Sequence, residues 1–247
     1  MRVFSVFVCF VCCASLQAQI AFTNLSSGRT APGVTAGHYV TAYGNFAGVS
    51  ATQASAVPFP ATLGGVTVSV DGTSAPLQFV GPTQINFLVP ARTTTGLKEV
   101  RVTTPTATVS GSVRVVTAAP GIIVQDQATP PKGAIRNQDN ALNAESSPAR
   151  RGEVIQIFGT GPGALNTSIA DGAAAPASPL ARTVSTPQVF IAGTEAVVQF
   201  SGMTPGLVGL WQVNAEVPNR PGISGRVPVV VFIDGVDANE VAAFVAQ

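Results

Sequence analysis

A seven-residue segment that occurs twice is the feature that most constrains this chain. Residues 84–90 read QINFLVP and residues 212–218 read QVNAEVP, so Gln, Asn, Val and Pro occupy matching positions in both copies. The copies lie 128 residues apart, and similar sequence surrounds each one. We therefore predict two copies of one small module, because the units of a solenoid are shorter and depend on their neighbours.

The residues around each copy alternate between apolar and polar side chains, which is the pattern of half-buried strands. Residues 66–70 read VTVSV, and Asp71 and Gly72 then predict a tight hairpin turn, after which residues 77–80 are expected to return. The 25 glycines and 19 prolines suit many short strands joined by turns. No stretch shows sustained helical periodicity, so we predict an all-β chain.

The second half of the chain follows the first half at offsets that grow along the sequence. Residues 151–159 match 36–44 at an offset of 115, and residues 198–202 match 77–81 at an offset of 121. Such drift is expected when loops change length after a duplication. With about 100 residues per unit, we predict two tandem immunoglobulin-like β-sandwich domains, over residues 19–118 and 119–247, joined by a short, stiff connector.

The first 18 residues are predicted to be a signal peptide. Arg2 precedes an almost unbroken apolar run over residues 3–16, and Ala18 offers a small residue for cleavage. We therefore expect an exported chain whose mature form has no disulfide and is stabilised by core burial alone. All of the cysteines lie in this segment, and none has the context of a lipid-anchored residue: Cys9, Cys12 and Cys13.

Charge and composition exclude several function classes. The formal net charge is +1 and only 10% of the residues are charged, so nothing favours binding to nucleic acid or to anionic lipid. No other apolar segment approaches the ~20 residues that span a bilayer, so no retained membrane span is expected. The 46% of hydrophobic residues is enough for one large or two small cores.

Three segments of the second half resemble a known family. Residues 137–139 (NQD), 151–161 (RGEVIQIFGTG) and 209–214 (GLWQVN) are similar to the Solibacter-type uncharacterised C-terminal domain, which occurs in secreted proteins of soil acidobacteria. The resemblance covers residues 119–247 strongly and the first half loosely. It implies sandwich modules like those of the IPT/TIG branch and a secreted location, and it implies no known activity.

On a strand, the repeated segment places its amides on one face and its apolar residues on the other, although Leu88 interrupts the polar row of the first copy. One interpretation is a polar ledge that binds a ligand. The favoured interpretation is a motif that holds the fold, because its amides bond loop backbone groups that otherwise lack partners. The residues of this structural motif are Gln84, Asn86, Pro90, Gln212, Asn214 and Pro218.

The chain offers few residues for catalysis. His38 is the only histidine, and Glu153 holds the matching position in the second half. No Ser-His-Asp set can be assembled, and no cysteine outside the signal peptide is present for a thiol enzyme or a zinc site. A glycosidase pair of Asp139 with Glu145 or Glu153 is a less favoured alternative.

Two motifs resemble ion-binding loops but lack essential parts of them. Residues 137–140 (NQDN) resemble a calcium loop, yet Ala141 and Leu142 occupy positions that need a ligand or a glycine, so a turn built on Asn and Asp side chains is favoured. Residues 159–163 (GTGPG) follow a predicted strand but lack the Lys–Ser/Thr ending and the helix of a phosphate loop. We expect no metal and no cofactor.

We therefore predict a non-catalytic protein, not an enzyme, that is secreted or displayed on the cell surface. Its modules are expected to mediate adhesion or to contact an extracellular protein or glycan whose identity the sequence leaves open, as it does the oligomeric state. The alternative is an enzyme, or an accessory module, that acts on extracellular polysaccharide. Convergent carboxylates in a cleft would favour that alternative.

Export gives the first testable prediction. The apolar run and Ala18 predict cleavage before Gln19 when the protein is produced in a secreting host. Intact-mass spectrometry of the exported protein is expected to show a chain that starts at Gln19. An intact Met1, or a lipid on one of the cysteines, would contradict it.

Overall fold

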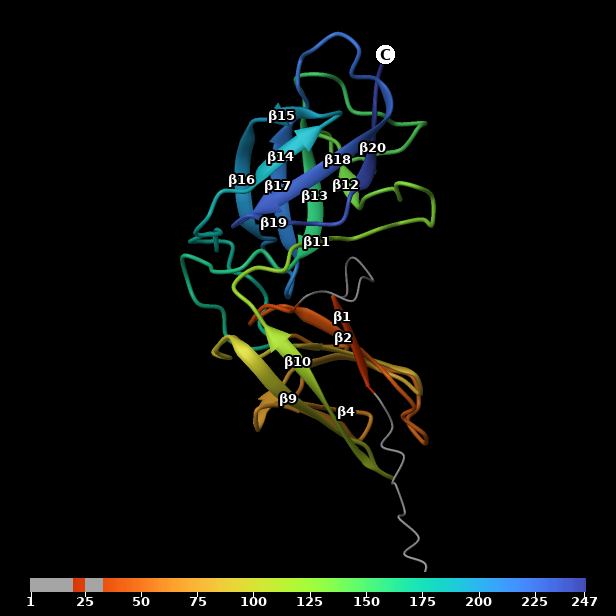
Figure 1. Ribbon diagram of the computed structural model, residues 1–247, viewed down its shortest axis with the longest axis vertical. Helices are drawn as coiled ribbons and strands as arrows, with labels where there is room; N and C mark the ends of the chain where they lie inside the picture. Colours follow the sequence, from red (N-terminus) through yellow and green to blue (C-terminus); the bar gives the residue numbers. More distant parts are fainter. Residues whose placement is uncertain (1–19, 25–32) are drawn as a thin grey trace, which may run out of the picture.

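The computed structural model describes residues 20–24 and 33–247, which form two β-sandwiches one above the other (Figure 1). These residues include no helix that is long and apolar enough to cross a membrane. The predicted signal peptide, residues 1–18, lies outside the described residues, and its cleavage stays a prediction.

The first sandwich consists of two antiparallel sheets. One has the strand order β1-β2-β8-β7-β3, and the other has the order β10-β9-β5-β4, with β6 also paired to β5. The strands are β1 (Ala21–Asn24), β2 (Tyr39–Tyr43), β3 (Thr52–Gln53), β4 (Thr62–Leu63), β5 (Val66–Val70), β6 (Thr73–Ala75), β7 (Leu77–Val80), β8 (Gln84–Leu88), β9 (Gly96–Thr103) and β10 (Thr108–Val115).

The second sandwich has the same two-sheet construction. One sheet has the order β11-β13-β17-β16 with β12 paired to β13, and the other has the order β15-β14-β18-β19 with β20 paired to β18. The strands are β11 (Gly121–Ile122), β12 (Ile135–Arg136), β13 (Val154–Thr160), β14 (Gln188–Ile191), β15 (Thr194–Ala196), β16 (Val198–Met203), β17 (Trp211–Glu216), β18 (Gly225–Ile233), β19 (Val236–Asp237) and β20 (Val241–Val245).

The two sandwiches share one strand plan, and the all-β immunoglobulin-like fold predicted from the sequence is confirmed. The repeated segment forms β8 in one module and β17 in the other, each lying between two neighbours of its sheet. Even an irregularity is repeated. The pairing register shifts between Leu77 and Phe79 opposite β8, and between Val198 and Phe200 opposite β17. The modules therefore repeat a β-bulge as well as a pattern of apolar residues.

The hairpin turn predicted at residues 71–72 is present, and residues 234–235 form a similar turn in the second module. Asp71 and Gly72 have φ angles of 47° and 77°, and Asp234 and Gly235 have φ angles of 51° and 75°. Two successive residues with positive φ produce the turn whose twist matches a tight hairpin. The Asp-Gly pairs are explained by this conformation, because both residue types tolerate it better than most.

The strand that returns from the first hairpin was predicted wrongly. Residues 77–80 were expected to pair with residues 66–70, but β5 pairs with β6, and β7 lies in the opposite sheet beside β8. The chain changes sheets at Pro76, which has no N–H to donate to a continuing ladder. Its carbonyl oxygen accepts a hydrogen bond from the Leu88 backbone N–H at 2.9 Å, and Val197 accepts from Glu216 at 2.9 Å in the second module.

Each module has its own apolar core, and the repeated segment contributes to both. The inward side chains of the segment are completely buried: Ile85, Phe87 and Val89 in the first module and Val213, Ala215 and Val217 in the second. Trp211 also packs in the core of the second module. Its indole Nε1–H donates to Ser201 Oγ at 3.0 Å, so the ring is buried without an unpaired donor.

The long segment between β13 and β14 brings the second module against the first (Figure 1). Hydrogen bonds cross between the modules: Phe59 N–H donates to Gly172 O at 2.9 Å, and Ala91 N–H donates to Asp171 Oδ1 at 2.7 Å. Ala175 and Ala181 of this segment form a small apolar cluster with Met203 at the end of β16, and Leu165 and Ile169 of the segment pack against it. The modules are thus held together by contacts as well as by the connector.

This contact explains why Leu88 interrupts the polar row of the repeated segment. A Cβ atom on Gly209 of the second module would lie 3.1 Å from Leu88 Cδ2 and 2.7 Å from Tyr39 Cε2. Tyr39 and Leu88 are paired across β2 and β8, and Leu88 is almost fully buried. The outward position at the end of β8 therefore faces the other module, and an apolar side chain is the one that packs there.

Candidate functional site

The amides of the first repeated segment form a hydrogen-bonded row on the outer face of the sheet. Asn86 Oδ1 accepts from Gln84 Nε2 at 2.8 Å and from Thr41 Oγ1 at 3.1 Å. Asn86 Nδ2 donates to Gln78 Oε1 at 3.0 Å. Thr41 lies opposite Asn86 on β2, and Gln78 is the residue at the β-bulge. The row therefore ties three neighbouring strands together through side chains.

The second copy retains the central bond of this row and less of the rest. Gln212 Nε2 donates to Asn214 Oδ1 at 2.7 Å. Gln156 occupies the position opposite Asn214 on β13, and its Nε2 donates to Asn140 Oδ1 at 3.0 Å. Asn214 is half-buried, whereas Asn86 is buried. The same amide pair is thus more enclosed in the first module than in the second.

The partners of these amides differ from the expected ones. Sequence predicts bonds to loop backbone groups, but the hydrogen bonds of Asn86 go to side chains on adjacent strands. The reason is position: the amides lie within strands, where neighbouring backbone groups already pair in the sheet. Pro90 and Pro218 lie two residues beyond the ends of β8 and β17, and their carbonyl oxygens accept from Thr93 N–H and Arg220 N–H.

The carboxylates considered for catalysis make local hydrogen bonds. Asp139 Oδ1 accepts from Ala141 N–H at 2.9 Å, which is the side-chain turn favoured over a calcium loop. Glu153 Oε2 accepts from Arg150 N–H at 2.9 Å, and Glu145 is exposed. Throughout residues 20–24 and 33–247, no group of three or more His, Cys, Asp or Glu side chains is placed to hold a metal ion.

His38 is placed in a different kind of environment. It follows Gly37 (φ 78°) immediately before β2, and its side chain is buried. Its Nδ1 lies 2.7 Å from Ala36 O, so the ring N–H at this atom donates to the carbonyl. Burial lowers the pKa of His38 from 6.5 to about 4, against the opposing effect of the Ala36 hydrogen bond. The imidazole is therefore neutral at neutral pH.

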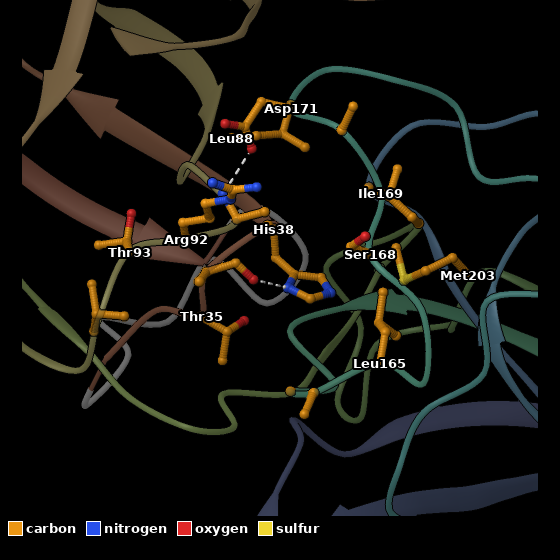
Figure 2. Close-up of a pocket in the computed structure, with 18 of the residues that line it drawn as sticks. Thr35, His38, Leu88, Arg92, Thr93, Leu165, Ser168, Ile169, Asp171 and Met203 are labelled. Atoms are coloured by element: carbon orange, nitrogen blue, oxygen red, sulfur yellow. Dashed lines mark hydrogen bonds between the residues drawn. The ribbon is translucent and has the colours of Figure 1, made fainter. Parts of the chain in front are cut away.

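A cavity of about 820 Å³ lies between the two modules, with His38 in its wall (Figure 2). Residues before β2, at and after the end of β8, and at the end of β10 form one side. The segment between β13 and β14 forms the other side, together with Met203 of β16 and Gly209. Leu165, Ser168, Ile169 and Met203 lie across from Arg92 and Thr93, with His38 between them (Figure 2). This cavity brings residues of both modules together, and it is the candidate site.

No local pattern in the sequence indicates this cavity, because its walls combine residues 35–38, 88–95 and 115–117 of the first half with residues 163–173, 203 and 209 of the second. The one available signal was that His38 has no counterpart in the second module. Its matching residue, Glu153, lies at the solvent-facing end of the second sandwich. A histidine that occurs in only one copy of a repeat indicates a position whose surroundings differ between the two copies.

Comparisons with known proteins identify no relative by sequence: no family model matches the chain, and no curated protein matches it. Solved structures give likenesses of fold. The extracellular region of plexin A4 matches at 11% identity and a TM-score of 0.29, over 99% of this chain and 17% of that chain. The titin Ig tandem A164–A165 matches at 7% and 0.24, over 93% of this chain and 96% of the other. Domains 5–6 of the S-layer protein SbsC match at 16% and 0.29, over 94% and 98%.

The amide row gives a stability prediction. Asn86→Ala is expected to lower the free energy of unfolding of the first module by about 1–3 kcal/mol, because it leaves Thr41 and Gln78 with unpaired groups. Asn214→Ala is expected to cost less, about 1 kcal/mol or below, because one half-buried bond is lost.

The aromatic residues allow each module to be followed separately in denaturant. Both tyrosines, Tyr39 and Tyr43, lie in the first module, and the single tryptophan, Trp211, lies in the second. Tyrosine absorbance should therefore report Asn86→Ala, and tryptophan fluorescence should report Asn214→Ala. An unfolding transition unchanged by Asn86→Ala, together with loss of binding to a ligand, would favour the ledge interpretation instead.

Burial of His38 gives a prediction for pH. Its pKa is lowered in the folded state, so the unfolded chain takes up the proton first as the pH falls. The wild-type protein is expected to lose stability between about pH 6.5 and pH 4, by at most about 3 kcal/mol, and none of this contribution is lost above pH 7. The measurement is the denaturant midpoint as a function of pH for wild type and for His38→Gln. The carboxyl groups are the same in both proteins, so the difference between the two curves reports His38. Parallel curves would contradict the prediction.

Proposed function

We propose that the protein is a non-catalytic, secreted or cell-surface protein of tandem immunoglobulin-like modules that contacts an extracellular glycan or protein. The observation that carries this proposal is the docking of the two sandwiches, through Phe59 with Gly172 and Ala91 with Asp171. Independent domains on a flexible linker move relative to each other. A docked pair instead presents its outer faces together, which suits recognition of an extended surface.

The surroundings of the titratable groups support the absence of catalysis in this proposal. A general base has to reach the proton that it removes, and a nucleophile needs a base within hydrogen-bonding distance. His38 donates to a backbone carbonyl, and among the described residues no carboxylate or hydroxyl is hydrogen-bonded to its ring. Asp139 and Glu153 are engaged in turns.

The predicted export and the resemblance to the Solibacter-type domain support the location in the proposal. A signal peptide over residues 1–18 would deliver the chain out of the cytoplasm, where immunoglobulin-like modules can act in adhesion or in surface assembly. A chain without cysteines after residue 18 would fold there without disulfides. Membership of that family is part of the proposal and rests on the motifs quoted from the sequence.

The test combines a binding screen with an activity screen on the same exported, purified protein. Binding is measured on a glycan array and by pull-down with isolated cell walls, and we expect retention on at least one surface without turnover. Activity is measured on esters, peptides and common polysaccharides with wild type and His38→Ala. Turnover that persists through purification, and that is lost with His38→Ala or with substitution of one carboxylate, would contradict the non-catalytic proposal, and turnover of a polysaccharide would support the polysaccharide-active enzyme instead.

A further inference from the structure

Two buried polar atoms in the wall of the inter-module cavity have no hydrogen-bond partner. They are Nε2 of His38 and Oγ1 of Thr35, and both side chains are at least nine-tenths buried. An acceptor or donor that is buried without a partner destabilises the fold. Most buried polar groups are paired, so an unpaired one needs an explanation, such as a partner that arrives with a ligand.

The hydrogen bond of the other ring nitrogen determines what His38 offers. A carbonyl oxygen only accepts, so the contact of Nδ1 with Ala36 O places the single ring proton of neutral imidazole on Nδ1. Nε2 then carries a lone pair and no proton. The group that satisfies it must be a donor, either an O–H or an N–H.

The rest of the cavity has the character of a small-molecule site. Its volume of about 820 Å³ lies within the range of roughly 300–1,000 Å³ that is usual for ligand sites, and it lies at a domain interface, where such sites are frequent. Its apolar side chains include Leu88, Leu165, Ile169 and Met203. Apolar walls with a few placed polar groups bind compact organic molecules in a defined orientation.

We propose that this cavity binds a small organic molecule with a compact apolar body and one hydroxyl or N–H group, which donates to Nε2 of His38. Simple aromatic or cyclic alcohols are the smallest members of this class. The proposal is independent of the glycan or protein contact proposed above, because it concerns the space between the modules and not their outer faces.

The charged side chains of the cavity place no strict demand on the charge of the ligand. Asp171 uses Oδ1 to accept from Ala91 N–H, and Arg92 is exposed to solvent. Nε2 itself is covered, so a donor reaches it only when the atoms around it move. The wall includes Met203, an unbranched thioether side chain of the kind that adapts to new shapes at low cost.

The test uses the single histidine as its own reporter. In the full chain labelled with ¹⁵N-histidine, the Nε2 resonance belongs to His38 alone. Phenol and cyclohexanol are titrated at pH 7.5, with anisole as the analogue of phenol that has no O–H donor. We expect phenol and cyclohexanol to shift the Nε2 resonance saturably, and phenol to bind about 5- to 150-fold more tightly than anisole, the factor expected when a buried acceptor stays unpaired.

Two substitutions of alanine by tryptophan locate the binding site. Ala170→Trp places a large side chain in the cavity wall, and Ala128→Trp adds the same side chain at an exposed position outside it. Loss of the phenol-induced shift in Ala170→Trp and its retention in Ala128→Trp would support the proposal. No shift in wild type, equal affinity for phenol and anisole, or a shift that survives Ala170→Trp would each overturn it. The wild-type titration decides the matter even if a variant does not fold.

Discussion

The strand that carries the repeated segment is the constraint on which each module depends. It lies inside its sheet, so its backbone pairs on both sides, with β2 and β7 around β8 and with β13 and β16 around β17. Its inward side chains fill the core, and its last amide N–H bonds the residue at which the chain changes sheets, Pro76 or Val197. One strand thus links the core, both neighbours and the crossover. This explains why this segment is more alike in the two copies than the surrounding sequence.

The strands and turns could be predicted from the sequence because their causes are local. Alternating side chains and Asp-Gly pairs act over a few residues, and β5 and its turn at Asp71 lie where expected. The change of sheet at Pro76 was not predicted. A chain that stays in one sheet and a chain that crosses to the opposite sheet show the same alternation of apolar and polar side chains. The amide partners of Asn86 were missed for a related reason, since cross-strand neighbours depend on register.

The candidate site could not be predicted, because it exists only after the modules dock. Its walls combine the end of one sheet with a long loop of the other module, and no local pattern specifies that meeting. The composition indicated only that side chains suited to catalysis are few. The lowered pKa of His38 follows from the burial of its ring in the folded chain, which a single histidine in a sequence does not reveal.

Matching positions of the two modules carry different side chains at the end where the first module meets the second. Val89 N–H bonds His38 O in the first module, and Val217 N–H bonds Glu153 O in the second, so the two side chains start from equivalent backbone. In the second module this end faces solvent, and the residues matching His38 and Leu88 are acids, Glu153 and Glu216. A buried carboxylate without a partner would be costly in the covered first copy. A neutral imidazole and a leucine can be buried there at a lower free-energy cost. The remaining cost comes from Nε2 of His38, which is buried without a hydrogen-bond partner.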